Sequence, residues 1–381
     1  MFEVLQVSTF FGENGGVEKS VSDLSHALAE KLRVQVLCTA QGKTTREHIG
    51  KLRVTAAGGA LAVSGRPLSL SFASEIAKQN VDVAHYHLPC PIAVLTEPFA
   101  SPAARVRIAT WHHGLVRHKA FDAITRPLVD HFLRSMDAII VTSPQLIEHT
   151  PLLKRHYKKC IVIPLGIDEQ RFTELDENTV LDLRDKFGTP LLLYVGRLVY
   201  YKGCETLIRA IADVPNAKLV MVGRGPLEHK LRALICELGL EQRVHLLGWQ
   251  CENDLRSLFQ ACDLFVLPST LPTECFGLVQ VEAMLCGKPV INTDLPTGVP
   301  WVSIHEETGL TVQPNDPVAL SQAIGKIVGD SEYRKALGAN ARRRALEKFT
   351  LGRQVDAVIS FYEQLLSRSQ SSVASHEQSL V

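Results

Sequence analysis

The chain has 381 residues, of which 46% are hydrophobic and 21% are charged, and its formal net charge is +1. That length predicts two domains of about 150 to 200 residues, and the near-zero charge argues against a nucleic-acid-binding protein. The longest apolar runs are too short to span a membrane, and the nine cysteines include no C-x-x-C pair, which argues against a zinc site and is typical of a reduced cytoplasmic protein. We expect no signal peptide, because the first residues, Met1–Val7, already form a strand-like segment.

Basic residues are concentrated in residues 1–171, where Lys and Arg outnumber Asp and Glu by 20 to 15, whereas the remainder has 21 against 25. Part of the excess lies in the run Lys154-Arg155-His156-Tyr157-Lys158-Lys159. Two interpretations stay open: an ordinary solvated face, or a surface that contacts anionic lipid headgroups or the phosphates of an acceptor. In the second, the protein would lie peripherally on the inner face of the cytoplasmic membrane.

Residues 1–168 alternate between strand-like and helix-like segments, which is typical of a parallel sheet with helical crossovers. We predict a Rossmann-like domain here. Its predicted strands are Val4–Thr9, Val34–Cys38, Val81–His85, Arg107–Thr110, Ala138–Val141 and Ile161–Ile163, and its predicted helices are Val17–Lys31, Leu70–Lys78 and Ala120–Ser135.

After a polar stretch that lacks strand character, the alternation restarts and predicts a second Rossmann-like domain at 169–350. Its strands are Leu191–Val195, Lys218–Val222, Val244–Leu246, Leu264–Leu267 and Pro289–Asn292, and its helices include Cys204–Ala212, Leu227–Leu238, Asn253–Phe259, one that ends near Cys286, Pro317–Val328 and Glu332–Glu347. A helix at 351–366 is expected to pack back on the first domain. Ser367–Val381 is expected to be a disordered tail. Two doubly wound α/β domains that face each other would enclose a cleft between the carboxyl ends of their strands.

In the first domain, three motifs follow predicted strands. Gly15 and Gly16 precede a helix, which either permits close approach to a phosphate or sugar or only allows tight packing. The pair His112-His113 can hydrogen-bond a sugar hydroxyl or stabilise developing charge, although one of the two is expected to be structural. His85-Tyr86-His87 is interpreted as scaffold or acceptor-site lining rather than a metal site.

In the second domain, Glu274 and Glu282 bracket a loop-to-helix junction, and they cannot share one helical stripe because eight positions correspond to about 80° around a helix. Glu274 therefore belongs to the loop. The backbone amides of Phe276, Gly277 and Leu278 at the helix start can bind a phosphate, and each carboxylate suits a diol. This order of groups predicts a site for a sugar nucleotide.

Further candidate residues follow neighbouring strands of this domain. Arg197 and Lys202 are placed to straddle a diphosphate, although two solvated loop cations would look the same in sequence. Arg224 could stack on a base, with backbone groups near Trp249 and Gln250 reading its edge, but either loop could also be an ordinary turn. No nucleophilic triad and no D-x-D pair for a divalent cation is visible, so the cations and helix amides would neutralise the leaving group without a metal.

These residues resemble the retaining glycosyltransferases of family 4, which have the GT-B fold of two facing Rossmann-like domains. The resemblance runs from Gly15-Gly16-Val17-Glu18 to about Lys348. It implies that Glu282 binds the ribose hydroxyls and Glu274 the transferred hexose. It also implies that Phe276, Gly277 and Leu278 supply backbone donors, that Arg197 and Lys202 bind the diphosphate, and that His112 rather than His113 is the active-site histidine.

The segment Asn292–Trp301 also resembles bacterial mannosyl- and rhamnosyltransferases of polysaccharide assembly, including lipopolysaccharide. The implied reaction transfers a hexose, with mannose or rhamnose favoured, from a GDP- or UDP-linked donor to a saccharide or lipid-linked saccharide, with retention and without a cofactor. Two alternatives stay open: a sugar-nucleotide epimerase of the same fold, and a non-catalytic partner protein.

Overall fold

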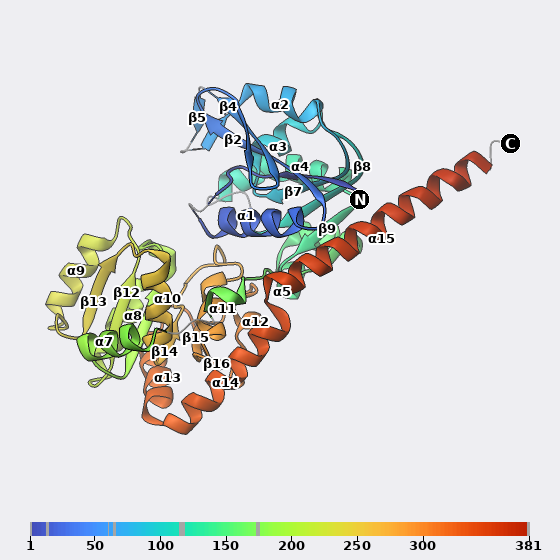
Figure 1. The fold of residues 1–381 in the computed structure, drawn as a ribbon. Helices are drawn as coiled ribbons and strands as arrows, with labels where there is room; N and C mark the ends of the chain where they lie inside the picture. Colours follow the sequence, from blue (N-terminus) through green and yellow to red (C-terminus); the bar gives the residue numbers. More distant parts are fainter. Residues whose placement is uncertain are drawn as a thin grey trace. The chain divides into compact units, whose positions relative to one another are not determined.

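The computed structural model describes residues 2–12, 15–59, 61–63, 66–113, 119–172 and 176–378 (Figure 1). Two compact units make up the chain: Met1–Gly166 together with Leu351–Val381, and Ile167–Thr350. Each unit is built on a parallel sheet with helical crossovers, so the predicted two-domain α/β class is confirmed.

The first unit contains an eight-stranded sheet in the order β10-β9-β8-β7-β1-β2-β4-β3. Every neighbouring pair is parallel except β3 with β4. The strand order reverses between β1 and β7, and in parallel α/β sheets ligands commonly bind beyond the carboxyl ends of the strands at such a point. The strands are β1 (Glu3–Val7), β2 (Arg33–Gln41), β3 (Thr45–Ile49), β4 (Leu52–Gly59), β7 (Asn80–Leu88), β8 (Ala103–Trp111), β9 (Ala138–Val141) and β10 (Cys160–Val162), with β5 (Leu61–Val63) and β6 (Arg66–Leu68) forming a separate pair.

Helices cover this sheet and bury continuous apolar strands such as β9, whose four residues are all buried. The C-terminal helix α15 (Leu351–Gln378) belongs to this unit, and its Val355, Val358, Tyr362 and Leu366 join the sheet and α1 (Gly16–Ala29) in one core (Figure 1). The other helices are α2 (Leu70–Ala77), α3 (Pro91–Thr96), α4 (Lys119–Ser135), α5 (Pro144–His149), α6 (Pro151–Arg155) and the 3₁₀ turn η1 (Tyr157–Lys159).

The expectation of a disordered tail from Ser367 is wrong for most of that segment. The helix α15 continues to Gln378, twelve residues past the predicted end at Leu366. Residues 367–378 are polar but contain neither proline nor glycine, so nothing in the backbone stops a helix already nucleated by the packed turns before it. Residues 379–381 lie outside the described part of the chain.

The second unit contains six parallel strands in the order β13-β12-β11-β14-β15-β16. The order reverses between β11 and β14, which is the dinucleotide-binding arrangement of a Rossmann sheet. The strands are β11 (Leu191–Val195), β12 (Lys218–Val222), β13 (Val244–Gly248), β14 (Leu264–Val266), β15 (Val290–Thr293) and β16 (Gly309–Val312).

Ten helical segments accompany this sheet among the described residues, and the polar stretch before the first strand contains two of them, η2 and α7. They are η2 (Glu169–Phe172), α7 (Glu177–Phe187), η3 (Tyr200–Lys202), α8 (Cys204–Ala212), α9 (Glu228–Glu237), α10 (Glu252–Ala261), α11 (Leu278–Leu285), α12 (Val299–Val302), α13 (Pro317–Gly329) and α14 (Ser331–Lys348). Over the described ranges, neither unit has a helix long and apolar enough to cross a membrane.

Candidate active site

The loops after β11 and β14 meet at the point where the strand order of the second unit reverses. The Thr270 backbone N–H donates to the Tyr201 carbonyl at 2.7 Å. Gly203 has φ 69°, and a Cβ there would lie 1.8 Å from the carbonyl oxygen of Pro268. Only glycine permits this close approach of the two backbones. The approach brings the loop after β11, which carries Lys202, beside the loop after β14, which carries Glu274.

An ion pair joins these two loops: Lys202 Nζ contacts Glu274 Oε2, and Ser269 Oγ donates to the same oxygen at 2.9 Å. The two charged side chains are only 13% and 12% exposed. Burial by itself lowers the pKa of Lys202, but the charge and hydrogen bond of the Glu274 carboxylate outweigh it and raise that pKa above its ordinary value. Lys202 therefore stays a cation where a diphosphate would need one.

The helix α11 begins directly after the loop that carries Glu274. Its N-cap is Gly277, with φ 67° and ψ 57°, where a Cβ would lie 2.5 Å from Leu267 Cδ2. The first amides of a helix have no intrahelical partner and can bind an anion. Glu274 lies in the loop and Glu282 within α11, half-buried, which is the placement that the sequence predicted.

Two buried amide side chains that the sequence analysis did not single out hold this junction in place. Gln280 Nε2 donates to the carbonyls of Phe276 at 2.7 Å and Val299 at 3.2 Å. Asn292 Nδ2 donates to Gln280 Oε1 at 3.2 Å and to the Ser303 carbonyl at 3.1 Å. The sequence did contain a signal for Gln280, because it lies inside the apolar run of α11. A polar residue at such a buried position needs hydrogen-bond partners.

The other candidates of the second unit lie at the ends of β11, β12 and β13. Arg197 is exposed, and its guanidinium has no ion-pair partner among the described residues. Arg224 is exposed beside Gly248, and Trp249 is 68% exposed. Gln250 Nε2 donates to the Leu247 carbonyl at 2.9 Å, so this side chain is turned onto its own loop. The structure thus brings Lys202 and Glu274 into contact but does not bring Arg197 to either.

In the first unit, Gly16 starts α1 and Gly15 is its N-cap. A Cβ on Gly15 would lie 2.2 Å from Glu18 Oε2, whereas Gly16 has nothing within 4 Å of that position. The space beside Gly15 is therefore filled by a flexible carboxylate, and the space beside Gly16 is open.

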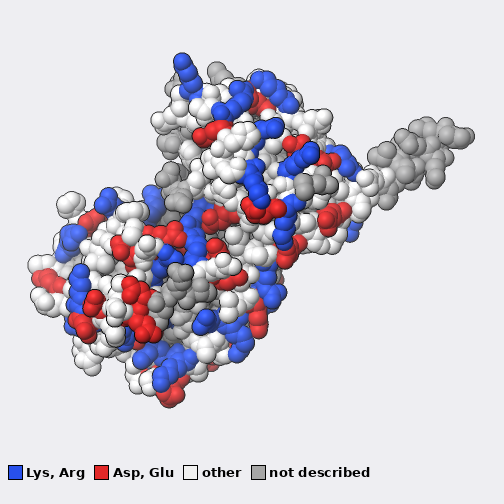
Figure 2. Space-filling view, in the orientation of Figure 1, with Lys and Arg blue, Asp and Glu red and all other residues white. Residues whose placement is uncertain are grey.

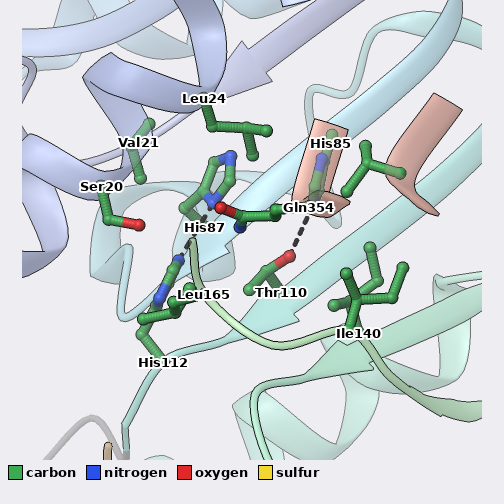
Figure 3. Close-up of a pocket in the computed structure, with 12 residues that line it drawn as sticks. Ser20, Val21, Leu24, His85, His87, Thr110, His112, Ile140, Leu165 and Gln354 are labelled. Carbon is green, nitrogen blue, oxygen red and sulfur yellow. Dashed lines mark hydrogen bonds between the residues drawn. The ribbon is translucent and has the colours of Figure 1, made fainter. Parts of the chain in front are cut away.

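His112 directly follows β8, is 5% exposed, and its backbone N–H donates to the Leu88 carbonyl at 3.1 Å. Its Nε2 lies 3.1 Å from Nδ1 of the buried His87 (Figure 3). Burial and then the neighbouring His87 and His113 lower the pKa of His112 well below its ordinary value, so the ring is neutral. A small pocket with room for about one water molecule lies against His85, His87, Thr110, His112, Ser20 and Gln354.

No group of three or more His, Cys, Asp or Glu side chains within the described ranges is arranged to hold a metal ion. Three neighbouring histidines of the first unit form hydrogen bonds instead. His87 bonds His112 and Gln6, and His85 bonds Tyr362 and Thr110.

The basic cluster at 154–159 is partly used inside the first unit. Arg155 pairs with the buried Asp130, and Lys159 Nζ donates to carbonyls at the end of α4, including that of Met136 at 2.6 Å. Lys154 and Lys158 remain exposed. Because Arg155 and Lys159 are engaged within the unit, fewer cations of this cluster are available to an anionic surface than the sequence suggested. On the face shown in Figure 2, Lys and Arg are interspersed with Asp and Glu.

The two Rossmann-like sheets and the groups at their strand ends are typical of proteins that bind nucleotides, and comparisons with known proteins identify the class as glycosyltransferases. Residues 14–171 match the family described as Glycosyltransferase Family 4, and residues 182–344 match Glycosyl transferases group 1. The chain is 31% identical to O-antigen chain mannosyltransferase C of Escherichia coli, over 92% of this chain and 95% of that protein. It is 33% identical to the D-rhamnosyltransferase WbpZ of Pseudomonas aeruginosa, over 76% of this chain and 75% of that protein.

Solved structures give the same result for the fold. Sucrose-phosphate synthase from Thermosynechococcus elongatus superposes with a TM-score of 0.80 and 26% identity, over 96% of this chain and 99% of that chain. Anabaena HepE in complex with UDP has a TM-score of 0.79 and 22% identity, over 95% of this chain and 100% of that chain. The chain belongs to the family 4 glycosyltransferases and has the GT-B fold.

Proposed function

We propose that this glycosyltransferase moves a mannose or rhamnose unit from a nucleotide diphosphate sugar to a saccharide, or to a lipid-linked saccharide, in the synthesis of a cell-surface polysaccharide such as an O-antigen. The observation that carries the proposal is the buried Lys202–Glu274 pair beside the start of α11, at the reversal of the Rossmann sheet. The choice of sugar and pathway is supported by what the two bacterial relatives are named for.

In the proposed roles, Glu282 binds the ribose diol and Glu274 holds hydroxyls of the hexose. The α11 amides, Lys202 and Arg197 bind the diphosphate and neutralise it as it leaves. Lys202 is held beside Glu274 by its ion pair, whereas Arg197 is exposed and has no ion-pair partner among the described residues.

The proposed reaction retains the anomeric configuration and needs no metal. The bond between C1 of the sugar and the diphosphate oxygen breaks, and the acceptor oxygen bonds to C1 on the same face. The acceptor proton passes to the departing diphosphate oxygen, so no enzymic nucleophile takes part. A covalent sugar adduct on any side chain of the protein would contradict this route.

The test is a thermal-shift comparison of GDP, UDP and ADP, followed by an assay with GDP-mannose, a nucleotide-linked rhamnose and UDP-glucose. We expect one nucleotide to raise the melting temperature and its mannose or rhamnose conjugate to support transfer with retention. Glu282→Ala should weaken nucleotide binding, whereas His112→Ala should mainly lower kcat. Equal losses of nucleotide affinity in both variants would contradict this division of roles, and donor conversion without an acceptor would indicate an epimerase.

Membrane association is a separate part of the proposal. We expect binding to vesicles that contain anionic lipid, with an affinity that falls as salt rises, because Lys154 and Lys158 are exposed. Lys154→Glu/Lys158→Glu should abolish the binding. Binding that is absent at low salt would remove this part and leave the transferase proposal intact.

A further inference from the structure

A continuous chain of buried hydrogen bonds crosses the first unit and ends at His112. Figure 3 shows the two end bonds of this chain, His87 with His112 and His85 with Thr110. His112 Nε2 lies 3.1 Å from His87 Nδ1, and His87 Nε2 lies 2.6 Å from Gln6 Oε1. In the orientation that the Gln6 amide has here, its oxygen faces His87 Nε2. An amide oxygen can only accept, so in this orientation His87 Nε2 carries the proton and His87 Nδ1 is an acceptor. His112 Nε2 must then be the donor, which leaves His112 Nδ1 as a bare lone pair.

The same chain continues from Gln6 toward α15. Gln6 Nε2 donates to the Tyr362 hydroxyl at 3.2 Å, and the Tyr362 hydroxyl lies 2.5 Å from His85 Nδ1. Gln6 Nε2 can only donate to the Tyr362 oxygen, so among the hydrogen bonds of the described residues His85 Nδ1 is the one acceptor available to the Tyr362 hydroxyl proton. His85 Nε2 then donates to Thr110 Oγ1 at 2.6 Å. All five donors therefore point the same way, from His112 toward Thr110.

This direction depends on one group. Turning the Gln6 amide over would place its NH₂ group against His87 and its oxygen against Tyr362. Every bond in the chain would then reverse, and His112 would present a protonated Nδ1. Gln6, His87 and Tyr362 are 0 to 2% exposed, so water does not compete for these groups. Burial lowers the pKa of His85 to about 3 and those of His87 and His112 well below 6.5, and neutral rings are what this bonding pattern requires.

The open end of the chain is the point where a ligand can enter. His112 Nδ1 is buried and has no hydrogen-bond partner among the described residues, and His112 directly follows the carboxyl end of β8. A buried acceptor without a partner is costly, and a hydroxyl group supplied by a ligand would satisfy it.

We propose that Gln6, His87 and Tyr362 are positioning residues that hold His112 in its Nε2-protonated tautomer, so that Nδ1 accepts a hydrogen bond from a sugar hydroxyl. Tyr362 comes from α15, so the C-terminal helix contributes directly to the state of a strand-end residue. The identity of the ligand rests on the proposed function, whereas the tautomer does not.

The first test measures the tautomer in the full-length protein labelled with ¹⁵N-histidine. Long-range ¹H–¹⁵N spectra distinguish protonated from bare ring nitrogens, and loss of signals in His112→Gln assigns His112. We expect a bare Nδ1 and a protonated Nε2. A protonated Nδ1, or a doubly protonated ring at pH 7.5, would overturn the proposal.

The second test removes parts of the chain. Tyr362→Phe and Gln6→Met should each leave His87 without a fixed donor–acceptor pattern, so His112 should populate both tautomers. Tyr86→Phe is the matched control, because Tyr86 is also fully buried but its hydroxyl has no hydrogen-bond partner within the described ranges. We expect Tyr86→Phe to leave the His112 spectrum unchanged. If His112 kept a single, unchanged tautomer in both Tyr362→Phe and Gln6→Met, the hydrogen-bond chain would not set its tautomer, and the proposal would be refuted.

The third test uses turnover. With the donor found above, Tyr362→Phe should lower kcat roughly tenfold while the KM for the donor changes little, as expected when one hydrogen bond to a reacting ligand is no longer held in place. Tyr86→Phe should keep the kcat of the wild type. An equal kcat in both variants would contradict the positioning role. If no donor is found, the proposed function fails, but the spectra still decide the tautomer.

Discussion

At the scale of single residues, Lys202 and Glu274 depend on each other because both are largely removed from water. Lys202→Met leaves the Glu274 carboxylate without its cation, and we expect the free energy of unfolding to fall by about 3 kcal/mol. The double variant Lys202→Met/Glu274→Gln should recover most of this loss, since no charge is then left unpaired, while transferase activity stays low. Urea unfolding and donor consumption measure the two effects.

An exposed pair provides the control for this experiment. Lys335 and Glu332 form a surface pair with side chains 71% and 81% exposed. Lys335→Met should change stability little, because water already screens such pairs. A loss in Lys202→Met no larger than that in Lys335→Met would show that the buried pair contributes nothing to the fold.

At the scale of elements, the close approach of the loops after β11 and β14 positions Lys202 beside Glu274. A substitution at Gly203 tests whether this approach is required. Gly203→Ala forces a left-handed backbone on an L-residue and pushes a Cβ against the Pro268 carbonyl. We expect a loss of about 2 kcal/mol in unfolding free energy, together with weaker nucleotide binding, because the β11 and β14 loops must separate. Thermal unfolding with and without nucleotide measures both.

Gly325→Ala, within α13, is the matched control for Gly203→Ala. A Cβ on Gly325 would have nothing within 4 Å, and its backbone is helical. The substitution should stabilise the protein by about 0.5 to 1 kcal/mol. If Gly203→Ala were equally harmless, the close approach to Pro268 would not constrain the site.

For the whole molecule, α15 is required for the first unit, although it follows the second in sequence. A chain that ends at Thr350 lacks Val355, Val358, Tyr362 and Leu366, which belong to the core of the first unit. We expect this truncation to be insoluble or to lose the cooperative unfolding of that unit. A chain that ends at Gln370 should unfold like the full-length protein, as measured by circular dichroism. Cooperative folding of the shorter chain would contradict this assignment.

Stability should also depend on pH through three buried histidines of the first unit, His85, His87 and His112. Their folded-state pKa values are lowered, to about 3 for His85, so the unfolded chain binds more protons below 6.5. The stabilisation is present above pH 6.5 and is lost as the pH falls from there toward the folded-state values. Urea unfolding at pH 7.5 and 5.5 should show a lower midpoint at pH 5.5, and His85→Gln should reduce the difference. An equal midpoint at the two pH values would contradict neutral burial.

Sequence patterns predicted the strands of both sheets best where nearly every position is buried and apolar. Ala138–Val141, Leu191–Val195 and Lys218–Val222 were predicted with the bounds that the structure has. The antiparallel pair of β3 with β4 was missed because β3 is an exposed edge strand without an apolar pattern. The helix α7 was missed because its surface is polar, so periodicity carried little signal.

The glycines, the two glutamates and the strand ends that carry them are local patterns with local physical reasons, and they predicted a sugar-nucleotide site. The resemblance of these motifs to family 4 glycosyltransferases then indicated the class of the protein. The apolar run after Gly277, together with the angular spacing, placed Glu282 on a helix and Glu274 in a loop. Only the tertiary structure decided which groups touch: Lys202 with Glu274, and His112 through His87 and Gln6 to Tyr362 of the last helix. Those contacts join residues up to 356 positions apart, and they follow from the order of the strands and the return of α15, which no local pattern encodes.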